Sequence, residues 1–504
     1  MPRKYMVPLA GPYTSRISAV NASDSTSGYV GTGIVGLMIV GKTTQSTDKD
    51  ARYINCFLSS VSDPITGKKR IYVVKRPGFG TFNTPAAGEK GYQILVWTGQ
   101  GTGEKVISAF GQTNSTIYDS TTSLGAITGQ ATGLTESAVG ATVPTLFITS
   151  ADSTAWYYDV VTAVVTKIAD ADFPGNAGKV LAGTFAHLKG FAVIMTADGL
   201  IYASDLNSGT GWTSNSFDSA NAYPDKGVGC YRFKTFIMAF GTESLEFWYN
   251  AGLTPFPLAR ADAMTLKVGA VSADAIAQIS DTTFFVGSTP QGGIQVFKYN
   301  GNLSPISTPE INSILILAGA SNISLTTIRF YGRSFVLVKA GPTTLVYCVE
   351  ENFWHEWNST FPLWTKCAGV SVGGTMVNYA VSNISTDGKV FLMNQASLVF
   401  TDNATTYTAR IQTAPEDQGT TRKKFYSYLD IVGDVESSSS PLTISYSDDD
   451  YATYTTWGDI DLSGSNRRAT RLGSSKRRGW VFIHSAATPM RLERAEGEME
   501  VGPA

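Results

Sequence analysis

The amino-acid sequence predicts an all-β protein built on a β-propeller of six or seven blades, with a β-rich platform formed by the N- and C-terminal segments. Three observations predict it. Charged residues make up only 16% of the 504 residues, aromatic residues reach 11% and there are 50 glycines, which is typical of turn-rich β proteins. The middle of the chain repeats a strand–turn–strand unit. Both flanking segments alternate apolar and polar residues as strands do.

The repeat is the observation that predicts a propeller. Each unit has an apolar strand, a short turn of Gly, Asp, Ser or Thr, and a second strand centred on an aromatic residue. These aromatic residues are Tyr118, Tyr158, Tyr202, Phe247, Phe297, Tyr347 and Phe391, spaced 40–50 residues apart. Propeller blades recur at this period, and stacking blades around an axis buries faces that one blade leaves open. An irregular array of β-sandwiches is the alternative.

Charge divides the chain into three predicted regions. Residues 1–91, a basic segment of the platform, hold 12 Lys and Arg against 5 Asp and Glu. Residues 92–405, the propeller, hold 15 against 22, and residues 406–504, a β domain of the platform, hold 12 against 14. This asymmetry indicates that different parts of the chain contact different partners. No run approaches 18 apolar residues, so no membrane-spanning segment is predicted.

Two glycine-rich motifs resemble nucleotide-binding loops. GLMIVGKTT, residues 36–44, matches the phosphate-binding pattern G-x-x-x-x-G-K-[ST], and GTGIVG, residues 31–36, matches G-x-G-x-x-G. Neither is followed by the helical pattern whose N-terminal amides would face a phosphate. We therefore expect a strand at 34–40 and no nucleotide cofactor. GVSVG, residues 369–373, also precedes a strand pattern, whereas a nucleophilic serine of this motif requires a helix.

Catalytic and metal-binding patterns are sparse. The chain has three histidines, at 187, 355 and 484, and its four cysteines show no C-x-x-C spacing, so no metal site is predicted. Scattered cysteines fit synthesis in a reducing cytoplasm. Because propeller glycosidases use carboxylates, Asp159, Asp205 and Glu246 keep open the alternative of a carbohydrate-binding or glycoside-hydrolysing propeller. We favour a chain with no catalytic residues and no cofactor.

Two clusters of cations are the candidate interface. The first surrounds the predicted strand IYVV, and the second occupies a Gly- and Ser-rich stretch that can adapt its shape to an acidic partner. Their residues are Lys68, Lys69, Arg70, Lys75, Arg76, Arg467, Arg468, Arg471, Lys476, Arg477 and Arg478. A solvated loop is the alternative for the second cluster.

Three stretches resemble the packaged-DNA stabilisation proteins, also called tail nozzle or tail hub proteins, of short-tailed double-stranded-DNA phages. They are YINCFLSS with KKRIYVVKRPGFGTF near the N-terminus, RFKTFIMAFGTESLEFWYNAG at Arg232–Gly252, and RATRLGSSKRRGWVFIHSAATPMRLERAEGEME at the C-terminus. Their order is maintained from about Tyr53 to Glu500, and residues 1–50 show no match.

The resemblance implies a structural virion protein of the phage tail, made in the host cytoplasm. It implies a propeller with a platform, assembled as a homohexameric ring below the portal and its adaptor. The ring would extend the DNA channel, retain packaged DNA and conduct it during ejection without sequence specificity. It would also carry spikes or fibres.

Overall fold

The computed structural model describes residues 3–7, 52–62, 69–97, 104–136, 146–159, 163–289, 293–358, 366–372 and 374–502. The chain divides into two compact units. Unit 1 comprises residues 1–78, 345–360 and 398–504, and unit 2 comprises 79–344 and 361–397. Both chain ends therefore belong to unit 1, which is the platform of the predicted fold.

Unit 2 is a series of antiparallel sheets. The first sheet has the order β6 (Lys90–Trp97), β7 (Lys105–Gly111), β8 (Ser115–Asp119) and β9 (Thr122–Ile127). The second has the order β10 (Ala131–Glu136), β11 (Leu146–Ser150), β12 (Ala155–Asp159) and β13 (Val164–Lys167). The third has the order β14 (Leu181–Leu188), β15 (Phe191–Thr196), β16 (Leu200–Ser204) and β17 (Trp212–Ser219). The fourth is β18 (Gly227–Phe233), β19 (Phe236–Gly241), β20 (Leu245–Asn250) and β21 (Leu258–Arg260).

The remaining sheets of unit 2 are less regular. The fifth holds β22 (Gly269–Ala270), β23 (Ile276–Ile279), β24 (Thr282–Ser288), β25 (Ile294–Tyr299) and β26 (Leu303–Pro305). The sixth begins with the hairpin of β27 (Ile323–Phe330) and β28 (Arg333–Ala340), and the seventh holds β31 (Cys367–Val372), β32 (Thr375–Val381), β33 (Val390–Asn394) and β5 (Gly80–Asn83). The seventh sheet therefore joins strands from the two ends of the repeat region.

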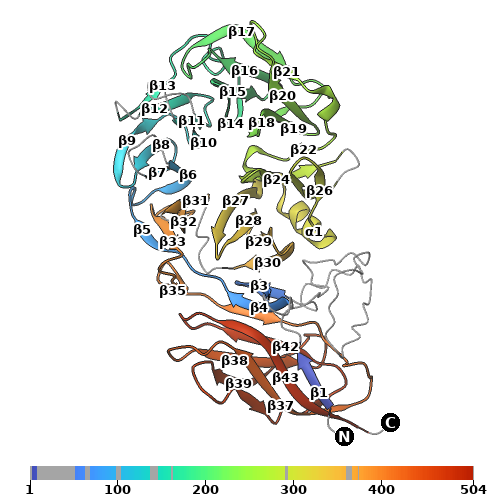
Figure 1. The fold of residues 1–504 in the computed structure, drawn as a ribbon. Helices are drawn as coiled ribbons and strands as arrows, with labels where there is room; N and C mark the ends of the chain where they lie inside the picture. Colours follow the sequence, from blue (N-terminus) through green and yellow to red (C-terminus); the bar gives the residue numbers. More distant parts are fainter. Residues whose placement is uncertain are drawn as a thin grey trace. The chain divides into compact units, whose positions relative to one another are not determined.

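The first strand of each sheet lies innermost, and these strands form a closed ring. Among the described residues, β6 contacts β10, β10 contacts β14 and β14 contacts β18. The fourth and fifth sheets meet through β19 and β22, then β23 contacts β27, β27 contacts β31 and β31 returns to β6. The ring of sheets is visible in Figure 1. Unit 2 is thus a β-propeller, and the ring has seven sheets, within the predicted six or seven.

The repeat predicted from aromatic residues corresponds to the second and third strands of each sheet. Six of the seven aromatic residues lie on the third strand of a sheet in unit 2, and Tyr347 lies on β29 (Thr343–Cys348), where the chain passes into unit 1. The predicted boundary after residue 91 falls inside β6, because the innermost strand precedes the repeated pattern. Residues 345–360, predicted as propeller, are in unit 1.

Unit 1 contains two sheets. One has the order β3 (Cys56–Ser62), β4 (Lys69–Lys75), β43 (Arg491–Val501), β37 (Lys424–Gly433) and β40 (Arg468–Thr470), with β1 (Arg3–Val7) on β43 and β41 (Ser474–Ser475) on β37. The other has the order β30 (Phe353–Trp357), β2 (Arg52–Ile54), β36 (Ala409–Gln412), β42 (Gly479–His484), β38 (Pro441–Ser447) and β39 (Thr455–Asp461). A small hairpin pairs β34 (Thr401–Asp402) with β35 (Thr405–Thr406).

The core of unit 1 lies between these two sheets. Val73, Leu429 and Leu492 from the first sheet pack with Ile444 and Phe482 from the second, and all five side chains are buried. Along β37 and β43, buried residues alternate with more exposed ones, which agrees with the alternation of apolar and polar residues in the sequence of these segments. Phe353, from residues 345–360, packs against this core, so segments from three separate parts of the chain share it.

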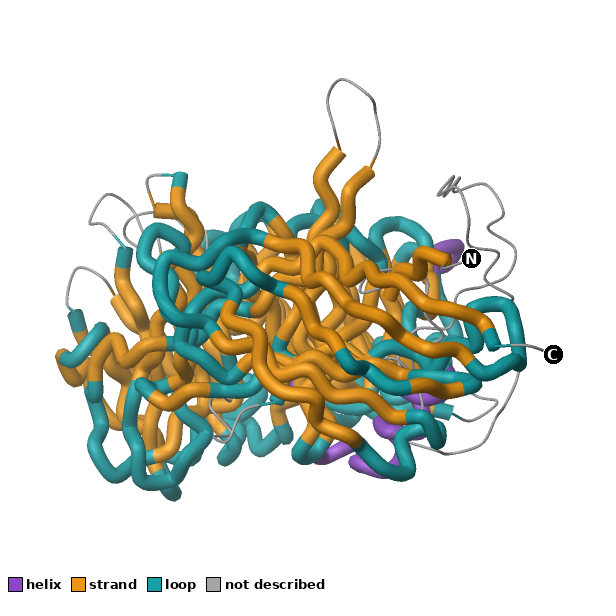
Figure 2. The backbone as a smooth tube through the Cα atoms, turned by 90° about the horizontal axis from the view of Figure 1, so that it is seen from below, coloured by secondary structure: helices purple, strands orange, loops and turns teal. Residues whose placement is uncertain are grey.

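Helical structure is scarce in the described chain, as Figure 2 shows. It comprises the α-helix α1 (Pro309–Ala318) and the short 3-10 segments η1 (Asp262–Met264), η2 (Ala273–Ala275) and η3 (Ala320–Asn322). Thr308 caps α1 by accepting a hydrogen bond from the Ile311 amide at 3.4 Å. Within the described ranges, no helix has the length and apolar character needed to span a membrane. GLMIVGKTT lies outside the described residues, and residues 369–372 lie on β31.

Candidate functional site

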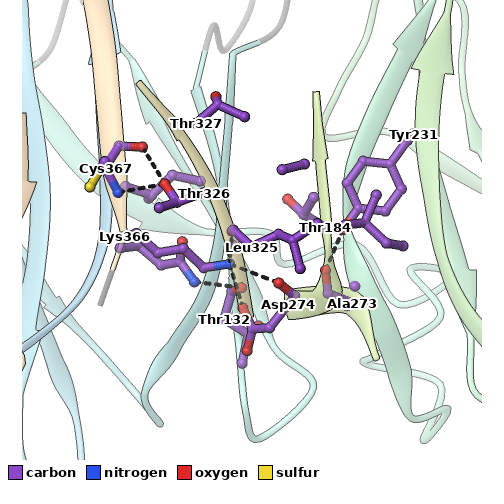
Figure 3. A pocket seen from close by; sticks show the side chains of 16 residues that line it. Thr132, Thr184, Tyr231, Ala273, Asp274, Leu325, Thr326, Thr327, Lys366 and Cys367 are labelled. Carbon is purple, nitrogen blue, oxygen red and sulfur yellow. Dashed lines mark hydrogen bonds and ion pairs between the residues drawn. The ribbon is translucent and has the colours of Figure 1, made fainter. Parts of the chain in front are cut away.

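The innermost strands of unit 2 enclose a small polar cavity of about 190 Å³, shown in Figure 3. All seven sheets contribute to its lining. One residue from each, in ring order, is Gln93, Thr132, Thr184, Tyr231, Ile276, Thr326 and Cys367, and Asp274 of η2 also lines it. The sequence analysis missed these residues because the innermost strands do not carry the repeated aromatic residue. The available signal was the hydroxyl-bearing and glycine residues in the strand that precedes each repeated unit.

The cavity is narrow because glycines let the innermost strands approach closely. A Cβ added to Gly133 would lie 2.5 Å from the Thr184 Cβ, and one added to Gly183 would lie 3.0 Å from the Gly229 Cα. Gly183 also has a φ of 72°, a conformation that other residues rarely adopt. Glycine at these positions therefore brings neighbouring innermost strands into close contact around the cavity.

Hydrogen bonds link neighbouring sheets around the cavity. The Tyr231 hydroxyl of the fourth sheet donates to the Ala273 carbonyl of the fifth at 2.9 Å. The Lys366 ammonium lies 2.9 Å from the Asp274 carboxylate and 3.4 Å from the Leu325 carbonyl, so it connects the seventh sheet to the fifth and sixth (Figure 3). These contacts hold the ring closed at its centre.

The cavity does not supply a pair of catalytic carboxylates. Among the described residues that line the cavity, Asp274 is the only acid, and it is ion-paired with Lys366. Glycoside hydrolysis requires two carboxyl groups facing one bond. Glu246 instead lies buried in the fourth sheet, where it accepts hydrogen bonds from the Ala222 amide at 2.7 Å and the Trp248 indole at 3.2 Å. Burial raises its pKa.

Asp205 does not join Glu246 in a site. Asp205 is exposed and accepts a hydrogen bond from the Thr213 hydroxyl at 2.9 Å, which fixes the turn between β16 and β17. Asp159 ends β12, and its side chain is outside the described residues. In the part of the chain that the structure describes, no group of three or more His, Cys, Asp and Glu side chains is arranged to hold a metal ion.

Arg76, predicted at an interface, is instead fully buried in unit 1. Its guanidinium donates to both oxygens of the Asp402 carboxylate, at 3.1 and 2.5 Å, and to the Asn55 side-chain oxygen at 2.9 Å. It lies 4.0 Å from the centre of the Tyr407 ring and 5.0 Å from that of Trp357. Burial acts to lower the pKa of Arg76, but the Asp402 charge outweighs it and the pKa lies above its ordinary value.

Lys75, also predicted at the interface, is buried beside Arg76. Its ammonium donates to the Ala486 carbonyl at 2.6 Å and lies 3.4 Å from His484 Nδ1, and the other His484 nitrogen lies 2.8 Å from the Ser440 hydroxyl. Burial, reinforced by the Arg76 charge, lowers the Lys75 pKa to about 8. Burial, followed by the Lys75 charge, lowers the His484 pKa to about 3. Lys75 and Arg76 therefore lie in the interior of unit 1 rather than at an interface. The sequence prediction was wrong here because it had no means of identifying their distant partners.

The stretch Arg76-Pro77-Gly78, which follows Lys75, is held against a distant part of the chain. The Gly78 amide donates to the Val399 carbonyl at 2.7 Å, and a Cβ on Gly78 would lie 2.1 Å from the Thr401 carbonyl oxygen. Only glycine permits this approach. Arg76 and Gly78 together fasten residues 76–78 to residues 399–402 inside unit 1. Of the remaining residues of the first cluster, Arg70 is exposed, Lys69 lies on β4 with its side chain undescribed, and Lys68 is outside the described residues.

The second predicted cluster also contains structural cations. Arg478 is buried, donates to both oxygens of Asp448 at 2.7 Å and stacks over the Tyr446 ring at 3.8 Å, so it is removed from the candidate interface. Arg467 is half-buried and donates to three backbone carbonyls, including that of Gly433 at 2.9 Å. Such contacts fix loops rather than recruit partners.

Four cations of the second cluster remain at the surface. Arg468 donates to both oxygens of Asp430 at 2.7 Å, and Arg477 lies 2.8 Å from the Asp450 carboxylate. Arg471 and Lys476 are exposed, with no ion pair to another described residue. The two predicted clusters lie apart in one sheet, because β43 and β37 separate β4 from β40.

Sequence reasoning missed a neighbouring group of cations. The buried Lys424 ammonium donates to the carbonyls of Thr420, Arg422 and Lys476, which brings the two loops together. Arg422, Lys423 and Lys476 are exposed around it, and we call these three residues the basic rim. The run TRKKF, residues 421–425, was the available signal.

Comparison with known families agrees with this architecture. The family model described as Bacteriophage P22 Gp10, beta-propeller, matches residues 53–376, which is more than half of the chain. No curated protein matches the sequence. The matched range covers the strands that lead into the propeller and nearly all of its sheets. The chain therefore belongs to the phage stabilisation family of P22 Gp10, the tail nozzle proteins of phage virions, and is a β-propeller member of it.

Proposed function

We propose that copies of this chain assemble into a closed ring, a homohexamer, that extends the portal–adaptor channel of the virion. The ring retains packaged double-stranded DNA, conducts it during ejection and anchors spikes or fibres, and the chain performs no catalysis. Membership of a tail nozzle family supports this proposal.

The size of the axial cavity carries the argument for a ring of copies. At about 190 Å³ it is smaller than the roughly 300–1,000 Å³ of pockets that accept drug-sized ligands. A DNA duplex is far larger, and the cavity is crossed by the Lys366–Asp274 contact. DNA therefore cannot pass through one propeller, and a duct has to lie between copies.

The exposed cations of unit 1 are the proposed contact with the neighbouring tail proteins. Arg70, Arg471 and the basic rim provide charge that no described carboxylate neutralises at ion-pair distance. An acidic surface on the adaptor or on a neighbouring copy would complement them. Lys75, Arg76 and Arg478 are excluded from this contact by their burial.

Assembly state is the primary test. Light scattering of the full chain, alone and with its adaptor, is expected to give a multiple of the 53.9 kDa chain mass. A monomer mass under both conditions would overturn the proposal. Replacing Lys476 and Lys423 with Glu should reduce adaptor binding at least tenfold, whereas Lys179→Glu in unit 2 should leave it unchanged.

Passage of DNA gives a second test. Residues 92–405 carry 15 Lys and Arg against 22 Asp and Glu, and a surface of this balance avoids the phosphate contacts that hold DNA in place. We expect the assembled protein to bind duplex DNA weakly and without sequence preference at physiological salt. Tight binding with a steep salt dependence would contradict a duct through which DNA slides.

A further inference from the structure

The strand β1 covers one edge of β43 in unit 1. Its register runs antiparallel from Arg3 opposite Met499 to Val7 opposite Ala495. On the same edge, β4 pairs with β43 only at Leu492 and Arg491. Without β1, the stretch 495–499 of β43 would present an open strand edge, and open edges recruit other strands.

Charge favours this particular pairing. Residues 1–7 carry two cations, Arg3 and Lys4, and no acid. The stretch 495–500 of β43 carries three glutamates, at 496, 498 and 500, and no cation. The register places Lys4 opposite Glu498, and opposite charges directly across a strand pair are stabilising.

The connection of β1 to the rest of the chain does not fix which copy it joins. Residues 8–51, 44 residues that lie outside the described ranges, separate β1 from β2. Fully extended, a segment of this length spans about 150 Å. The strand can therefore reach the β43 edge of its own copy or of a neighbour. Exchange of an identical element between copies keeps every main-chain hydrogen bond and adds an interchain link.

We propose that β1 is an exchanged arm: in the assembled ring, the β1 strand of each copy adds to the β43 edge of the adjacent copy. The inference rests on the ring of the proposed function. It explains why a short basic strand is placed on an acidic edge beyond a long connection. The β43 edge from Ala495 to Met499 is then an acceptor site for a second copy of this chain.

Cysteine pairs split between chains test the arm. Chains with Lys4→Cys are mixed with chains with Glu498→Cys during assembly, oxidised mildly and separated without reducing agent. A disulfide between the two positions can then form only between copies. We expect a covalent dimer containing one chain of each kind, at least tenfold above background.

The matched control uses the hairpin of β38 and β39, where the Thr443 hydroxyl donates to the exposed Asp459 carboxylate at 2.6 Å. Split between chains, Thr443→Cys and Asp459→Cys should give only background dimer; placed in one chain, they should cross-link within it. A second pair tests charge: Lys4→Glu should lower the ring fraction, and Glu498→Lys in the same chain should restore it.

Light scattering before oxidation separates the possible failures. One outcome would overturn the exchanged arm and leave the ring standing. In it, the protein has the mass of a ring, the split chains give no dimer, and the double variant Lys4→Cys/Glu498→Cys cross-links within a single chain. A monomer mass with the adaptor present overturns the ring and the arm together. Ring mass with no cross-link in either format also overturns the arm.

Discussion

Unit 2 and unit 1 are both built from β-strands, antiparallel except where β2 pairs with β30 in unit 1, yet their interiors are stabilised by different side chains. Between the fourth and fifth sheets of unit 2, Phe240 and Phe285 meet edge to face at 5.1 Å, and aromatic contacts recur around the ring. Unit 1 has an apolar core and, in addition, the buried cations Lys75, Arg76 and Arg478. A repeating sheet contacts its neighbours in sequence, whereas Arg76 and Asp402 join positions 326 residues apart. In unit 1, which has no repeat, the buried Arg76–Asp402 ion pair joins distant parts of the chain.

The largest expected effect breaks that closure. Arg76→Leu should lower the free energy of unfolding of unit 1 by about 3–5 kcal/mol, because it removes the ion pair and both charge-assisted hydrogen bonds that Arg76 makes to the buried Asp402 carboxylate. Urea denaturation of the full chain measures it. Arg70→Ala, on the neighbouring β4 strand and exposed, should change stability by less than about 0.5 kcal/mol.

Two further variants make the first prediction specific to the ion pair. Arg76→Lys keeps the charge but cannot donate to both carboxylate oxygens, so it should recover only part of the loss. Arg76→Leu combined with Asp402→Leu should recover more, because the buried carboxylate that lost its Arg76 partner is removed as well. If Arg76→Leu alone costs no more than Arg70→Ala, the comparison between the units fails.

The second prediction uses pH to test the buried ammonium. Lys75 faces Arg76, Asp402, His484 and the Tyr407 ring, and burial lowers its pKa from 10.5 to about 8. Between these values the unfolded chain binds more protons than the folded one, so the contribution of Lys75 to stability rises with pH. Relative to Lys75→Met, the natural chain should gain about 2 kcal/mol from pH 7 to pH 10.

Denaturation midpoints of both chains at the two pH values measure this gain. The difference between chains cancels the titration of tyrosines and cysteines elsewhere. If the difference in unfolding free energy between the natural chain and Lys75→Met stays constant across this pH range, the ammonium is solvated. Lys75 would then not be one of the buried cations of unit 1.

These two cations mark the limit of what the sequence could predict. The propeller was predictable because its strands recur at a regular period, and the third-strand aromatic residues repeat once per sheet. The interior of unit 1 was not, because nothing local distinguishes Lys75 and the following Arg76 from the exposed Arg70, which lies on β4 with Lys75. Their partners, Asp402 and His484, come from residues more than 300 positions away.

The third prediction sharpens the contrast from the side of unit 2. Phe285→Leu replaces one buried apolar side chain with another, so it should lower the free energy of unfolding by about 1–1.5 kcal/mol. Phe217→Leu, 40% exposed on β17, should cost less than about 0.5 kcal/mol. The conservative change Phe285→Leu between two sheets of unit 2 should thus cost little stability, whereas the conservative change Arg76→Lys in unit 1 should cost more. Thermal and urea unfolding of the full chain test both; equal losses for Phe285→Leu and Arg76→Leu would contradict the comparison.

The smallest expected effect concerns the Lys366 ammonium, whose contacts to Asp274 and Leu325 link parts of three sheets of the propeller. Lys366→Met removes the ion pair with Asp274, which is 59% exposed, so the loss should be about 0.5–1 kcal/mol at low salt. In 1 M salt, where screening acts over about 3 Å, the difference from the natural chain should nearly vanish. Lys179→Met, whose exposed ion pair with Asp198 lies beside a single sheet, is the control and should have a smaller effect at both salt concentrations. A loss from Lys366→Met that persists in 1 M salt would mean that this ammonium acts as a buried group. In that case unit 2 would also depend on interior charge for closure, and the two units would share one principle of construction.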